Sequence, residues 1–227
     1  MLRQLNRALL FTFLIVLYLY LAGGVSNKIT NKDRLSIKRL DLGSQCDKKA
    51  DFDAEVLCVR AIQTAIKELV PDTTCPPLGA IIEPPEFLER KRGCCYDRAR
   101  FTEKALIYYG FQTRHVALYD SEKYGYWSLF FPGVRSHATS EVNTAKGWMG
   151  VDSNFPFILI TQDKLPLTYQ NYQLHKHQLF DELKPIDFYR KNLLVIYGLH
   201  SRHGRFHGPD LPAPEFQISE LMFNFNN

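Results

Sequence analysis

The spacing of hydrophobic residues changes at Gly110, and no other feature of the sequence restricts the fold as much. Before Gly110, helical spacing and capping residues predict three helices: 53–69, a short one from Pro84, and 95–109. After it, β-forming residues and turns predict strands over 113–119, 124–131, 136–143 and 148–152, with a further apolar run at 155–160. N-terminal helices packed on a mostly antiparallel sheet indicate an α+β fold.

Beyond the predicted sheet the pattern is weaker. Residues 165–179 are predicted to be irregular or short helical, and residues 185–198 to be a helix. Residues 200–215 have little apolar content and several glycines and prolines, which predicts a surface loop. Three histidines fall in this loop: His200, His203 and His207. Scattered histidines in a flexible loop favour solvent exposure over a metal site.

The N-terminus has the features of a targeting segment. Arg3 and Arg7 precede an almost unbroken apolar run, residues 8–22, which is followed by small residues. Residues 1–24 are therefore predicted to be a signal peptide or an uncleaved anchor, with membrane attachment through residues 8–25, and both alternatives stay open. Either one predicts an exported protein that is periplasmic, extracellular or membrane-anchored.

The charge balance excludes one class of partner. Residues 26–45 are polar and basic, which predicts a tether or an edge segment, so residues 25–50 are assigned to a linker and residues 51–227 to the folded domain. The chain has 28 basic and 24 acidic residues, and without the first 24 residues its net charge is +2. Because no basic run alternates with aromatic residues, we expect no nucleic-acid partner.

Cys95 is the candidate nucleophile. It lies at the predicted start of helix 95–109, in the segment 93–99 (GCCYDRA). The unpaired N–H groups and the positive end of the dipole at a helix N-terminus favour a thiolate over a thiol. The backbone N–H of Cys95 is also a candidate donor to an oxyanion. A cysteine used in this way needs a base and a group that orients the base.

His137 and Asp152 are the predicted base and orienting group. The turn at residues 144–147 sets Thr139 opposite Asp152 in the predicted hairpin, so that His137 and Asp152 are diagonal neighbours. Diagonal neighbours share a face of the sheet with Cα atoms about 7–8 Å apart. A slip of one residue would place them on opposite faces, so the prediction depends on the register.

The cysteines are odd in number, five, which suits an exported chain with one free thiol. Pairing Cys46 with Cys58 and Cys75 with Cys94 is one arrangement that spares Cys95. Four cysteines allow three connectivities, and the sequence does not choose among them. A chain with five reduced cysteines is a further alternative.

Three motifs resemble the transglutaminase-like superfamily. The segment 93–99 is similar to its G-x-C-x-D-x-A motif, residues 136–142 (SHATSEV) resemble its histidine strand, and residues 147–152 (GWMGVD) resemble its W-x-x-x-D strand. The match covers residues 50–162 and leaves 163–227 as a C-terminal extension. The resemblance implies a papain-like core with a Cys95–His137–Asp152 triad, and it selects Cys95 over Cys94.

The same resemblance implies chemistry on amides through a cysteine thioester, either hydrolysis or acyl transfer. A leader followed by a compact core is similar to bacterial envelope members of the superfamily, some of them associated with surface polysaccharides. Peptides, amides or amino-sugar-containing molecules are then the expected substrates, and no cofactor or metal is expected. Because the superfamily includes proteins that have lost activity, the alternative is a non-catalytic binding or scaffold protein of envelope or surface-polysaccharide assembly.

Overall fold

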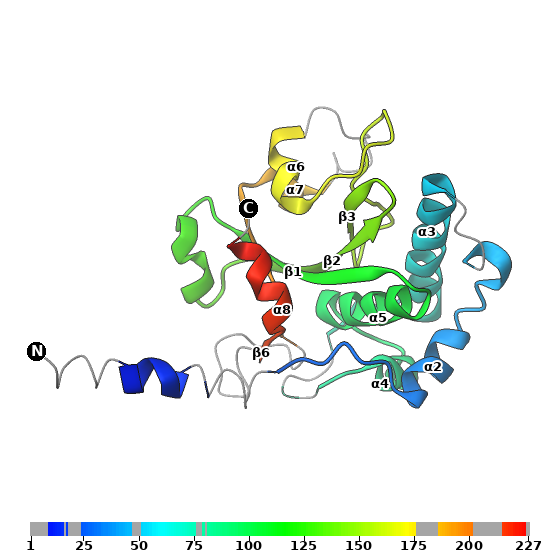
Figure 1. The fold of residues 1–227 in the computed structure, drawn as a ribbon, viewed down its shortest axis with the longest axis horizontal. Helices are drawn as coiled ribbons and strands as arrows, with labels where there is room; N and C mark the ends of the chain where they lie inside the picture. Colours follow the sequence, from blue (N-terminus) through cyan, green and yellow to red (C-terminus); the bar gives the residue numbers. More distant parts are fainter. Residues whose placement is uncertain are drawn as a thin grey trace, which may run out of the picture.

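The computed structural model describes residues 9–15, 17, 24–46, 51–75, 79, 81–175, 186–201 and 215–225. Helices surround an antiparallel four-stranded sheet, so the predicted α+β class is confirmed (Figure 1). The strands are β1 (Gln112–Asp120), β2 (Ser136–Thr144), β3 (Gly147–Val151) and β4 (Leu193–Tyr197). Their order across the sheet is β3-β2-β1-β4.

The predicted helices form a layer on one side of this sheet. The layer comprises α3 (Phe52–Leu69), α4 (Pro84–Arg90) and α5 (Cys95–Tyr108). Helix α5 packs directly on β1 and β2, and α3 and α4 pack on α5 (Figure 1). Asp51 begins α3 by accepting a hydrogen bond from the Ala54 N–H at 2.9 Å. Capping residues and the spacing of apolar residues thus determine where all three helices form.

The predicted linker contains a helix of the same layer. Helix α2 (Asn31–Lys38) packs on α4 and α5, and its Ile37 is fully buried. Thr30 and Asp33 form a capping box at its start. Asp33 is also buried, and it pairs with Lys104 of α5 at 2.8 Å. The predicted linker is therefore part of the folded domain over residues 31–38, because its buried carboxylate pairs with a residue far away in the sequence.

The predicted strand at 124–131 is wrong. Those residues form the 3₁₀ helix η2 (Gly125–Phe130). Aromatic residues favour strands when they pack on a neighbouring strand. Here Tyr126 and Trp127 are 84% and 68% exposed, so no such packing exists for them.

The predicted helix at 185–198 is also wrong over most of its length. It contains the short α7 (Asp187–Arg190) and then strand β4. Strand β4 pairs antiparallel with β1, where Val195 lies opposite Leu118. Residues 193–197 form a strand because β1 offers them a free edge to pair with, and the sequence of residues 185–198 alone does not show this. Helices α6 (Tyr169–His175) and α7 contribute Tyr169, Tyr172, Phe188 and Tyr189 to a second core with residues of β1 and β4.

The predicted surface loop begins in the interior. Strand β5 (Leu199–His200) pairs with β6 (Glu215–Phe216), and His200 is buried. His203 and His207 lie outside the described residues. The apolar run 155–160 forms isolated bridges at Ile158 and Ile160 in place of a named strand.

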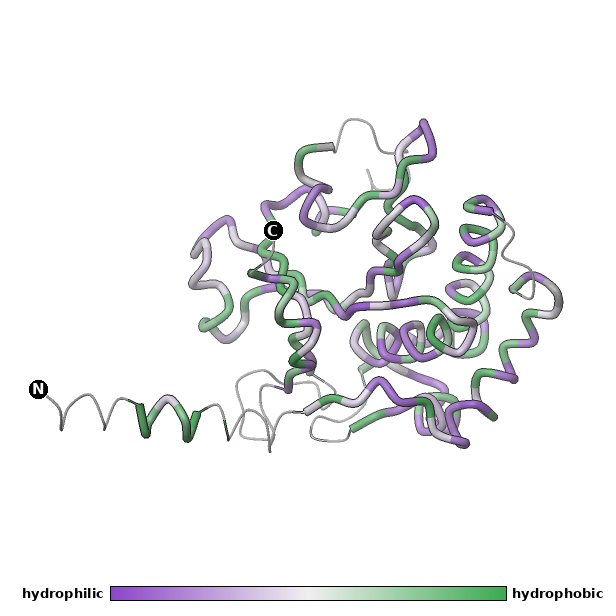
Figure 2. Tube along the Cα trace, in the orientation of Figure 1, coloured by the Kyte–Doolittle hydropathy of each residue, from purple (hydrophilic) through white to green (hydrophobic). Residues whose placement is uncertain are grey.

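Most of the predicted leader lies outside the described residues. Residues 9–15 and 17 are helical and mostly hydrophobic (Figure 2). Within the described ranges, none of the helices combines the length and apolar character that crossing a membrane requires.

Candidate active site

The start of α5 is held by the residues around Cys95. Asp97 accepts a hydrogen bond from the Cys94 N–H at 2.9 Å, which satisfies a donor that the helix cannot. A Cβ at Gly93 would collide with the ring of Phe87, so only glycine fits there. Arg98 is buried and donates to the backbone carbonyls of Gly93, Val70 and Asp72. Asp97 is thus an acid of the first turn that holds the start of α5.

The disulfides leave one free thiol. Cys46 is bonded to Cys58 and Cys75 to Cys94, which is one of the pairings that the sequence left open. Cys95 is free and partly exposed. The disulfide of the neighbouring Cys94 removes it as a competing nucleophile and ties the residue before α5 to the preceding loop.

The hairpin has the predicted register. Ser140 pairs with Val151 and Thr144 with Gly147. Extending this register by one residue beyond the Ser140–Val151 pair sets Thr139 opposite Asp152. Strand β3 ends at Val151, so Asp152 begins the loop that follows. The Nε2 atom of His137 lies 2.9 Å from the Oδ2 atom of Asp152, and both side chains are buried.

Asp152 receives hydrogen bonds on both carboxylate oxygens. Its Oδ1 accepts from the N–H groups of Asn154 and Phe155, each at 2.7 Å. Its Oδ2 accepts from the hydroxyl of Tyr189 as well as from His137. Tyr189 comes from α7, and no sequence motif marked it. A buried tyrosine 37 positions after the aspartate gives no local signal.

Gln63 of α3 holds the Asp152 loop from the other side. Its buried Nε2 atom lies within 2.9 Å of the backbone carbonyl oxygens of Asp152, Phe155 and Phe157. The only sequence signal for this role is a glutamine that interrupts the apolar face of α3. Gln63 therefore positions the carboxylate that positions His137.

We expect the Gln63→Leu variant to be less stable by about 1–3 kcal/mol, because the buried carbonyl oxygens of the loop lose their donor. Urea unfolding measures this change. The matched control is Gln112→Leu, at an exposed position of β1, where we expect a change within about 0.5 kcal/mol. Equal urea midpoints for the two variants would show that Gln63 does not hold the loop.

Cys95 and His137 interact through their side chains, and each shifts the pKa of the other toward its charged form. Asp152 engages the Nε2 atom, which leaves Nδ1 as the ring nitrogen for Cys95. Burial disfavours a charged sulfur, but His137 and backbone hydrogen bonds from Ala138 and Tyr96 outweigh it and lower the pKa of the Cys95 thiol.

The pKa values of the other two groups shift in opposite directions, and both shifts favour the charged form. Burial disfavours a charged imidazole, but Asp152 and Cys95 raise the pKa of His137 to about 10. Burial also opposes ionisation of Asp152, yet His137 and Tyr189 keep the pKa of that carboxyl below its ordinary value. All three shifts favour the charged forms: thiolate, imidazolium and carboxylate.

Aromatic rings enclose the imidazole. The ring centres of Phe155, Phe188 and Tyr189 lie 6.4, 5.8 and 6.2 Å from that of His137. They limit the rotation of the imidazole and keep water from its sides, while Cys95 stays accessible. The structure thus brings together the three residues that the sequence selected, from α5, β2 and the loop after β3.

Comparisons with known proteins add little. No family model matches the chain, and no curated protein matches it. Among solved structures, one described as "Crystal structure of a TGase" is 16% identical over 63% of this chain and 36% of that chain, with a TM-score of 0.37. This chain thus spans about a third of that structure. A likeness this weak carries no argument, so the papain-like core stays a prediction from the motifs.

Proposed function

We propose that the protein is a thiol-dependent amide hydrolase or acyltransferase that acts through a thioester on Cys95. One observation carries this proposal: His137, whose Nε2 atom is held by Asp152 at 2.9 Å, interacts with the free thiol of Cys95 and lowers its pKa. A nucleophile, a base and an orienting carboxylate in this order are the parts that acyl transfer needs.

The proposed reaction has two halves, acylation of Cys95 and release of the acyl group, and Cys95 and His137 act in both. The Cys95 thiolate attacks the carbonyl carbon of the amide, and the C–N bond breaks as the His137 imidazolium gives its proton to the leaving amine. The acyl group is then a thioester on Cys95. Water or an acceptor amine attacks the thioester while His137 takes its proton, and Cys95 leaves as the thiolate. Asp152 holds the imidazole in one orientation throughout.

The N-terminus of α5 supports charge stabilisation in this reaction. Cys95 is the first residue of the helix, where backbone N–H groups have no intrahelical acceptor. The Cys95 N–H is the proposed donor to the oxyanion that forms when the thiolate attacks.

We also propose that the protein is exported and acts on molecules of the cell envelope. Two disulfides are typical of an oxidising compartment, which supports export. We propose that the apolar residues 8–25 direct or attach the protein to the membrane, and that peptides, amides or amino-sugar-containing molecules of the cell envelope are its substrates.

Alkylation of Cys95 tests the ionised thiol. With excess iodoacetamide and no reductant, we expect one adduct per chain, formed faster at pH 6 than on a cysteine peptide, because the pKa of Cys95 is lowered. In His137→Ala the rate at pH 6 should fall about tenfold or more, since one unit of pKa changes the thiolate fraction tenfold. Mass spectrometry of the intact protein measures both rates.

Cys95→Ser is the control and should form no adduct, because the other cysteines are in disulfides. The contrary outcome is a folded protein whose Cys95 reacts no faster than a cysteine peptide, with or without His137. That outcome would favour the non-catalytic binding or scaffold role.

A further inference from the structure

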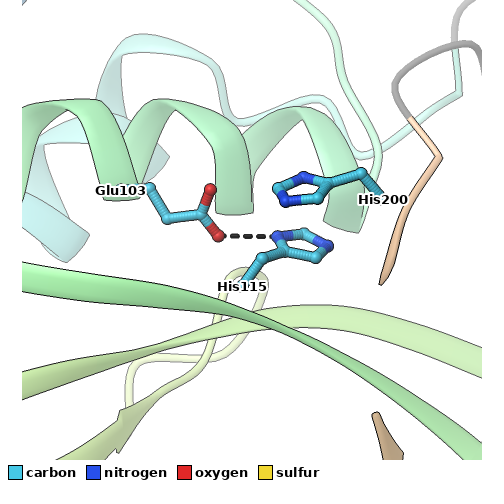
Figure 3. A group of neighbouring side chains, drawn as sticks. All are labelled: Glu103, His115 and His200. Atoms are coloured by element: carbon cyan, nitrogen blue, oxygen red, sulfur yellow. Dashed lines mark hydrogen bonds and ion pairs between the residues drawn. The ribbon is translucent and has the colours of Figure 1, made fainter. Parts of the chain in front are cut away.

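A second buried cluster of ionisable side chains lies away from Cys95. It consists of Glu103 on α5, His115 on β1 and His200 on β5, all at most 1% exposed (Figure 3). One donor atom from each residue lies within 4.8 Å of the others. The Nδ1 atom of His115 is 2.6 Å from Glu103 Oε1, and the two imidazole rings stack with centres 3.9 Å apart. The proposed reaction on Cys95 uses none of these side chains.

Two polar atoms of this cluster have no partner. Glu103 Oε2 and His115 Nε2 are buried without a hydrogen bond. Ser140 donates to Glu103, but to the oxygen that already faces His115. Buried polar groups in folded proteins are nearly always satisfied, so orphaned atoms in one cluster call for an additional ligand.

A second buried carboxylate adds negative charge beside the cluster. It is that of Glu220 on α8 (Ile218–Leu221), and it lies 3.6 Å from the Nε2 atom of His200. The neighbouring cationic side chains are engaged elsewhere, Lys104 by Asp33 and Arg114 by Glu141. Two buried carboxylates therefore share a dry space with two imidazoles. A divalent cation would neutralise both.

We propose that Glu103, His115 and His200 bind a divalent transition-metal ion, with Zn²⁺ the best match to two imidazole nitrogens and a carboxylate oxygen. Glu220 is placed to supply a fourth ligand, a second carboxylate oxygen, beside His200. The nitrogens of stacked rings point in parallel directions, so binding requires the His200 ring to turn out of its stack on His115. Because the ligands are buried and close the site to substrate, the role is structural. The ion would link α5 and β1 to β5.

Metal content tests this proposal without any assay of activity. The full chain, stripped with chelator and dialysed against Zn²⁺, should retain one equivalent by elemental analysis. It should unfold at a higher temperature than the stripped protein, because a ligand bound only by the folded state stabilises that state. Co²⁺ in place of Zn²⁺ should give visible absorption typical of nitrogen and oxygen ligands.

Variants locate the ion. Glu103→Gln, His115→Ala and His200→Ala should each weaken Zn²⁺ binding at least tenfold and remove the thermal shift. Cys95→Ser should still retain one equivalent, and this control separates the cluster from the thiol. Glu103→Gln keeps the size of the side chain, so it remains informative if a histidine variant does not fold. A folded wild-type chain that retains no metal, or metal lost in Cys95→Ser and kept in Glu103→Gln, overturns the proposal.

Discussion

Asp152→Asn is expected to slow acylation of Cys95 by p-nitrophenyl acetate at pH 6 by about 10²-fold. Removing the charge removes the main interaction that raises the pKa of His137, so the imidazolium that stabilises the thiolate is lost. The asparagine amide would also present a donor to Nε2 and favour the wrong tautomer. In an amide-cleaving triad this change costs about 10⁴. The activated ester loses less, because its leaving group needs no proton.

The release of nitrophenolate and the acetylated mass of the protein both report this rate. Asp187→Asn is the matched control, since Asp187 lies on α7 near the site and its ion pair with Arg135 is exposed. We expect its rate to stay within a factor of about two, because an exposed pair contributes little. If folded Asp152→Asn is acylated as fast as the control, Asp152 does not orient His137.

The parts of the site that sequence predicted are those that local rules determine. Gly93 and Asp97 mark the start of α5, and the turn at residues 144–147 fixes which residues of β2 and β3 face each other. Once the register is known, His137 and Asp152 follow. The resemblance to a known family added the choice between adjacent cysteines, and the disulfide of Cys94 agrees with that choice.

The parts that sequence did not predict depend on partners far along the chain. Tyr189 reaches Asp152 only because β4 pairs with β1 and carries α7 over the site. Residues 193–197 (LLVIY) fit a helix or a strand, and the open edge of β1 decides between them. His200 sits in a stretch of low apolar content, and its burial comes from the pairing of β5 with β6. Periodicity carries no information about such pairings.

One motif residue acquires a structural role. Glu141, four residues after His137 in β2, is buried against Arg114 of β1, with 2.6 Å between Oε2 and the guanidinium. The rings of Trp148, Tyr197 and Phe223 lie 4.3, 4.0 and 4.6 Å from that guanidinium. Glu141 also accepts the Tyr169 N–H at 2.7 Å. The pair therefore joins β1, β2 and the second core.

Replacing Arg114 by methionine is expected to destabilise the protein by about 3–5 kcal/mol, because Glu141 is left as a buried charge without its partner. Burial already raises the pKa of Glu141 despite Arg114, so the desolvation of the carboxylate outweighs the attraction. Without Arg114 the carboxyl should take up a proton more readily still. A group whose pKa is higher in the folded state stabilises folding at low pH and loses that contribution as the pH rises through the folded value.

The loss of stability in Arg114→Met should therefore be larger at pH 8 than at pH 5, and urea unfolding at the two values measures it. The matched control is Arg135→Met, which breaks the exposed pair with Asp187 and should cost at most about 1 kcal/mol at either pH. Arg114→Met/Glu141→Gln removes the buried charge and should be more stable than Arg114→Met at pH 8, because a neutral amide pays less for burial. Equal stability of the single and double variants at pH 8 would mean that the cost lies in lost packing on the three rings and not in the charge of Glu141.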